Sequence, residues 1–202
     1  MAHSRITIFK AWPAFRAVLL AVSLATPACA YDVPLTESSI RDAYFLGKRT
    51  DGLNFDFIAQ YARLVPNLKQ GDCTSDVRIE TPFLQAAKHA REAPNYSAQD
   101  AVKEFYGKPM TFRIYLDICY EENAPPNTVK FKIIQNKKVP TPLSFESTPY
   151  IEVTDFGYFP PYGEQITLEF KPEEIDSSDL EILIDTPDGQ HGETEFDLQA
   201  LR

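Results

Sequence analysis

The chain has 202 residues, of which 44% are hydrophobic, and it carries 20 basic and 29 acidic residues for a net charge of −9. This length and hydrophobic share allow one domain, or one and a half, with a buried core. The acidic balance repels nucleic acid phosphates and anionic lipid surfaces, which argues against partners of these two kinds.

Residues 1–30 have the order of a secretory signal peptide. Three basic residues and no acidic one precede an apolar run at 17–25, and Ala28, Cys29 and Ala30 supply small residues at a cleavage site. The run is about half as long as a bilayer span, which argues against a stable membrane anchor. We expect cleavage after Ala30 and a periplasmic or secreted bacterial protein, with lipidation of Cys29 as the alternative. Cleavage there leaves 17 basic and 29 acidic residues, a net charge of −12.

Two cysteines, Cys73 and Cys119, follow the predicted signal peptide. In an oxidising compartment a single pair of cysteines forms a disulfide by default. About 45 residues lie between them, and loop-closure entropy gives such a bridge about 4 kcal/mol. A redox-active pair would have the Cys-x-x-Cys spacing. We therefore interpret the pair as a structural disulfide.

Residues 31–109 are predicted to form a mainly helical N-terminal part. Apolar residues three and four apart, with capping residues before them and proline or glycine after them, predict helices near 37–46, 54–64, 83–93 and 99–105. The first two helices are expected to form an antiparallel hairpin. A loop at 66–76 is expected to hold Cys73, and a short strand is expected at 77–81.

Residues 110–202 alternate apolar and polar side chains as antiparallel strands do. The clearest strand is 111–120, with ten residues of period-two alternation, and further strands are expected near 129–133, 150–153, 165–170, 180–185 and 194–198. Turn-forming residues separate these segments. Six strands with one apolar face each favour a β-sandwich of immunoglobulin-like or related topology. The predicted fold class is α+β, with the helical N-terminal part packed on this C-terminal antiparallel β-sandwich in one compact unit.

One short segment of the chain resembles a known group of proteins. Residues 39–47, SIRDAYFLG, followed by a helical segment and a strand-rich second half, resemble an uncharacterised family of secreted bacterial proteins. The resemblance implies export and brings no activity with it.

The sequence lacks the common catalytic motifs. It has no Gly-x-Ser-x-Gly turn, no His-Glu-x-x-His pair and no glycine-rich phosphate loop. His3 belongs to the predicted signal peptide, and His89 is predicted to be a solvated helix residue. Acidic residues are plentiful, so a hydrolase that works through two carboxylates stays open.

The segment 185–197, DTPDGQHGETEFD, holds the candidate metal ligands Asp185, Asp188 and Glu193. Calcium prefers hard oxygen ligands from a flexible loop, which this segment has. However, the spacing matches no EF-hand, and Asp188-Gly189 also suits a hairpin turn. We interpret the segment as an acidic hairpin. Calcium is the alternative cofactor, and a transition metal held through His191 is a further one.

An aromatic cluster near 150–162 supplies the candidate binding residues Tyr150, Phe156, Tyr158, Phe159 and Tyr162. Exposed, these rings would make a surface for a protein partner or a glycan; buried, they would plug one end of the sandwich. The only tryptophan, Trp12, lies in the predicted signal peptide, which argues against a glycan. The favoured function is an exported, non-enzymatic binding or scaffolding protein with a protein partner. The alternatives are a carboxylate hydrolase acting on envelope or extracellular material and a calcium-dependent adhesion module.

Overall fold

The computed structural model describes residues 33–70, 73–120, 127–151, 162–176 and 178–201. The predicted signal peptide and the candidate binding residues Phe156, Tyr158 and Phe159 lie outside these ranges. Within them, no helix is both long and apolar enough to cross a membrane.

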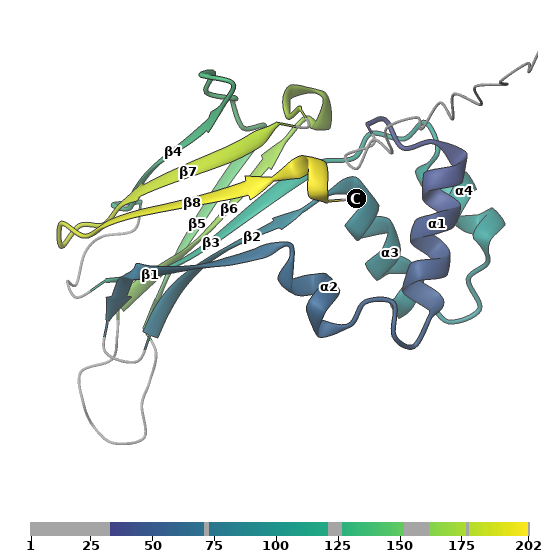
Figure 1. Cartoon of the computed structure of the whole chain (residues 1–202), viewed down its shortest axis with the longest axis horizontal. Helices are drawn as coiled ribbons and strands as arrows, with labels where there is room; N and C mark the ends of the chain where they lie inside the picture. The colour runs from purple at the N-terminus through teal and green to yellow at the C-terminus, as the bar shows by residue number, and fades with distance from the viewer. Residues whose placement is uncertain (1–32, 71–72, 121–126, 152–161, 177, 202) are drawn as a thin grey trace, which may run out of the picture.

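The helices of the described residues gather at one end of the molecule (Figure 1). They are α1 (Glu37–Lys48), α2 (Phe55–Ala59), α3 (Pro82–Glu92) and α4 (Ala98–Phe105). A polar side chain caps the N-terminus of each one by accepting a hydrogen bond from a backbone N–H; the caps are Thr36, Asn54, Thr81 and Ser97. At the start of α4, Ser97 and Asp100 form a reciprocal capping box.

The predicted helix at 54–64 and the predicted loop at 66–76 are largely wrong. The helix α2 ends at Ala59, and the chain continues as an antiparallel pair of strands, β1 (Ala62–Gln70) and β2 (Cys73–Glu80). The reason is tertiary, because Val65 and Leu68 are buried in the core that the two sheets share. Pro66 is tolerated since β1 is an edge strand, where a missing N–H leaves no partner unpaired.

Two antiparallel sheets confirm the α+β class. The larger has the order β1-β2-β3-β6-β5 and the smaller the order β4-β7-β8. The remaining strands are β3 (Phe112–Tyr120), β4 (Lys130–Gln135), β5 (Ser144–Ile151), β6 (Tyr162–Phe170), β7 (Asp179–Asp185) and β8 (His191–Asp197). The predicted segments match β3, β4, β6, β7 and β8 closely, whereas β5 begins several residues before the expected 150.

The buried apolar side chains form one cluster that includes strands of both sheets and the inward faces of α1 and α3, and the period-two alternation of the strands turns one face of each into it. The inward side chains of β3 are Phe112, Ile114, Leu116 and Ile118, and all four are buried. The predicted disulfide is confirmed: Cys73 and Cys119, with Cα atoms 6.2 Å apart, join the start of β2 to the end of β3. The bridge therefore links neighbouring strands of one sheet.

Candidate functional site

The predicted metal ligands lie on the β7–β8 hairpin and do not form one ligand set. Asp185 is paired with His191 across the hairpin, with Oδ1 and Nδ1 2.5 Å apart. Asp188 accepts hydrogen bonds from Thr186 and Gln190 and so shapes the turn. Glu193 is placed opposite Leu183 in the register. In the described part of the chain, no three His, Cys, Asp or Glu side chains gather as a metal-binding group.

Of the predicted aromatic surface, the described residues include the backbone of two members. Tyr150 is the second-last residue of β5, and Tyr162 is the first residue of β6. Ile151 pairs with Tyr162, so the two tyrosines lie on neighbouring strands at the same end of the larger sheet. The aromatic surface itself stays a prediction.

The outward face of the larger sheet carries polar side chains in cross-strand rows. The register defines three of them: Glu80, Arg113, Glu169 and Ser144; Arg78, Tyr115, Thr167 and Glu146; and Asp76, Asp117, Gln165 and Thr148. The sequence predicted a polar face for these strands. It did not show which charges would meet, because that depends on the register between strands.

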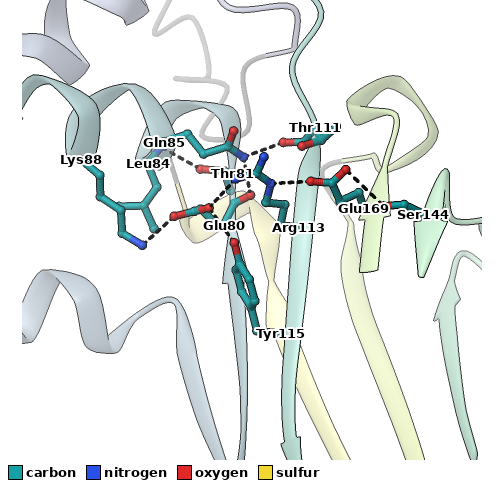
Figure 2. A network of polar contacts seen from close by, with 10 residues as sticks. All are labelled: Glu80, Thr81, Leu84, Gln85, Lys88, Thr111, Arg113, Tyr115, Ser144 and Glu169. Atoms are coloured by element: carbon teal, nitrogen blue, oxygen red, sulfur yellow. Dashed lines mark hydrogen bonds and ion pairs between the residues drawn. The ribbon is translucent and has the colours of Figure 1, made fainter. Parts of the chain in front are cut away.

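The first row forms a continuous network that reaches α3 (Figure 2). The Glu80 carboxylate is only 7% exposed, and Lys88 of α3 donates to its Oε1 at 2.6 Å. Tyr115 donates to its Oε2 at 3.1 Å, and the Arg113 guanidinium lies 3.6 Å from the same oxygen. Arg113 also donates to Glu169 at 2.8 Å. The network thus fixes the helical end of the molecule to the sheet.

The network has little catalytic capacity, because its charges are matched internally. Burial raises the pKa of the Tyr115 phenol, and the nearby negative charge of Glu80 adds to the effect. A phenol in this state is neither a base nor a nucleophile near neutral pH. Glu80 is held by several donors, so its carboxylate is already satisfied.

The third row brings two carboxylates together. Asp76 and Asp117 are opposite each other on β2 and β3, and Arg78 lies 2.9 Å from the first and 3.6 Å from the second. Burial raises the pKa of Asp76, and Asp117 adds to this while Arg78 opposes it. In residue type the pair matches the two-carboxylate hydrolase hypothesis. However, one guanidinium pairs with both groups, as in a structural ion-pair network.

The helical end has an aromatic hollow of about 330 Å³. The hollow is lined by residues of α1, α2 and α3 and by the C-cap residue of α1. These residues are Asp42, Phe45, Leu46, Arg49, Phe57 and Phe83. We call it the Phe groove. Phe83 is buried, whereas Phe45 is 57% exposed, and Phe55 at the start of α2 is 85% exposed.

The two charged residues of the Phe groove differ in their pairing. Arg49 donates two hydrogen bonds to Asp51, at 3.2 and 3.0 Å. The Asp42 carboxylate has no ion pair with any residue that the structure describes. The groove therefore combines aromatic rings with one unpaired negative charge.

Sequence reasoning missed the Phe groove, although one signal was present. Ile40, Ala43 and Gly47 form the buried stripe of α1, and Phe45 lies away from that stripe. A large aromatic residue off the buried stripe of an amphipathic helix is the pattern that could have marked the groove.

Comparisons of the chain with family models, curated proteins and solved structures found no match.

Proposed function

We propose that the protein is an exported, non-enzymatic binding protein that holds a protein partner in the Phe groove. The proposal rests on Phe45, which is 57% exposed and lines the groove together with Phe57 and Phe83. Phe55 at the start of α2 is a further exposed ring. Aromatic side chains are enriched at protein interfaces, where a few buried anchor residues dominate the binding energy.

Two other features support export and binding. The disulfide between Cys73 and Cys119 fits an oxidising compartment, in agreement with the predicted signal peptide. The charged side chains on the outward face of the larger sheet pair with one another, which leaves few of them to act as catalytic groups.

The exposed rings indicate a weak or transient complex. A phenylalanine can bury about 200 Å², so covering the exposed parts of Phe45 and Phe55 removes about 280 Å² from water. At about 25 cal/mol per Å² this is worth about 7 kcal/mol before any cost. Association itself costs about 4 to 15 kcal/mol. The partner therefore has to add contacts of its own.

The test compares a variant that lacks the two exposed phenylalanines with a control that lacks an exposed ring elsewhere. The Phe45→Ser/Phe55→Ser variant changes the groove region, whereas Tyr106→Ser removes an exposed ring beyond α4. Both are expected to fold, as checked by urea unfolding with the disulfide intact. A photo-cross-linker placed on α1 should capture a partner from envelope or culture fractions with the wild type and the Tyr106 variant.

Loss of that partner in the groove variant alone supports the proposal. Capture by all three proteins, or by none, contradicts it. The predicted aromatic surface is tested in parallel with Tyr158→Ala/Phe159→Ala. If this variant alone loses the partner, the binding face lies there instead.

A further inference from the structure

The strand β4 forms an open edge of the smaller sheet. It pairs with β7 on one side, and no other described strand pairs with it; Figure 1 shows it at the rim of the sandwich. Among the described residues, only the last residue of β4, Gln135, has a further backbone partner, Lys138 in the turn that follows. The other edges are protected. The β1 edge has Pro66 and a bulge, the β5 edge has Pro149, and β8 faces the bent end of β1, where Gly192 meets Leu68. The six residues of β4 have no proline and no bulge.

The same edge is basic in an acidic protein. From residue 127 to residue 145 the chain has four lysines and no acidic residue. Lys130 and Lys132 lie on β4, and Lys137 and Lys138 lie in the turn that follows; all four are exposed. None of them forms an ion pair with a described residue. Asp185 lies opposite Lys130 in the register with β7, and the charge of Lys138 acts on Asp176, so the positive charge is partly compensated within the protein and partly available to a partner.

Exposed apolar side chains continue the edge. Val139, Leu143 and Phe145 follow the turn, and each is about half exposed. The Phe145 ring stacks on Phe131 of β4, with ring centroids 5.9 Å apart. This stacking joins β4 and the start of β5 into one surface, which we call the β4 edge.

We propose that the β4 edge binds an extended acidic segment of a partner protein by strand addition. The backbone of that segment would pair with residues 130–134, a length of about 16 Å at about 3.3 Å per residue, because Gln135 already pairs with Lys138. Its carboxylates would face the lysines, and one apolar side chain would contact Val139 and Phe145. This proposal is independent of the Phe groove.

Charge distinguishes this occupant from the alternatives. Lysines on a strand edge repel the β4 edge of a second copy but attract an acidic strand. An anionic membrane would meet the acidic remainder of the protein as well, whose net charge is −9 for the whole chain. A short peptide lies within the screening distance of about 8 Å and therefore meets the local lysines.

The test uses the disulfide-bonded protein and a synthetic probe, the acetylated and amidated peptide Glu-Val-Glu-Val-Glu-Val. Binding is followed by calorimetry and by amide chemical shifts. We expect shifts at residues 130–135 and affinity that falls as salt is raised. The Lys130→Glu/Lys132→Glu variant should bind at least tenfold more weakly, and Lys130→Gln/Lys132→Gln should lose less. The matched control Lys103→Glu/Lys108→Glu has the same net charge change at exposed positions near α4 and should bind as the wild type does.

Four comparisons would overturn the proposal. Equal weakening in the control variant would mean that only net charge matters. Equal binding of a Lys-Val peptide, or of a Glu-Val peptide with alternate backbone N-methyl groups, would exclude charge matching or strand pairing. Binding of phosphatidylglycerol vesicles without binding of the peptide would identify an anionic lipid surface instead.

Discussion

Gly47 sets the distance between α1 and α3, and replacing it with alanine tests this packing. A Cβ atom at Gly47 would lie 2.1 Å from the Ala87 carbonyl oxygen and 3.1 Å from the Ala90 Cβ. Ordinary non-bonded contact is about 3.5 Å. Because the nearest atom belongs to the backbone, the two helices have to move apart by more than about 1 Å.

Two effects of opposite sign decide the result. Inside a helix, alanine stabilises the helical state by about 1 kcal/mol relative to glycine. Overpacking in a well-packed core costs about 1 to 3 kcal/mol, and a clash with backbone lies at the upper end. We therefore expect Gly47→Ala to lower the free energy of unfolding by about 2 kcal/mol. Phe45 and Leu46 precede Gly47 on α1, so the Phe groove should also widen.

Urea unfolding of the oxidised protein measures the effect. With a slope of about 2 kcal/mol per molar, the midpoint should fall by about 1 M. A midpoint that rises would show that helix propensity dominates and that α1 and α3 are not in close contact at this position. That result would refute the packing argument.

Three further predictions concern the sheets. Replacing Cys73 and Cys119 together with serine should lower the free energy of unfolding by about 4 kcal/mol in urea titrations, and a loss below about 1 kcal/mol would contradict the loop-entropy argument. The raised pKa of Tyr115 stabilises the fold below about pH 10, and this contribution is lost as the pH rises through the folded-state pKa. The urea midpoint should therefore decline less steeply above about pH 10 in Tyr115→Phe than in the wild type. Parallel plots of midpoint against pH for the two proteins would disprove the assignment. Buried Glu164 accepts hydrogen bonds from two backbone N–H groups and a serine hydroxyl. Glu164→Gln places an amide donor among these donors and should lower the free energy of unfolding, measured in urea or by heating, by about 1 to 3 kcal/mol. An unchanged stability would mean that these donors do not hold the side chain.

The local patterns of the sequence predicted most of the regular structure. The alternation at 111–120 predicted β3, and the capping residues Thr36 and Ser97 predicted the starts of α1 and α4. Two cysteines in a predicted exported chain predicted the disulfide. The strand and the helix starts depend on residues that are close in sequence. The disulfide follows because two cysteines can pair in only one way.

The errors and omissions share a different cause. The segment 66–76 has turn-forming residues and weak alternation, yet residues 66–70 belong to β1 and residues 73–76 to β2, because Val65 and Leu68 complete the core against β8. The buried Glu80 is satisfied by Lys88 and Tyr115, which come from another helix and another strand. Neither outcome is encoded within one short window.

The sequence by itself determined the fold class, the alternation of most strands, the caps of the helices and the cysteine pair. Only the tertiary structure decided the order of the strands, the charges that meet on the larger sheet, the exposure of Phe45 and the open β4 edge. The physical reason is the distance along the sequence over which the interactions act. Helix caps and strand alternation arise from neighbours a few residues apart, whereas register, burial and exposed edges depend on which distant segments pack together.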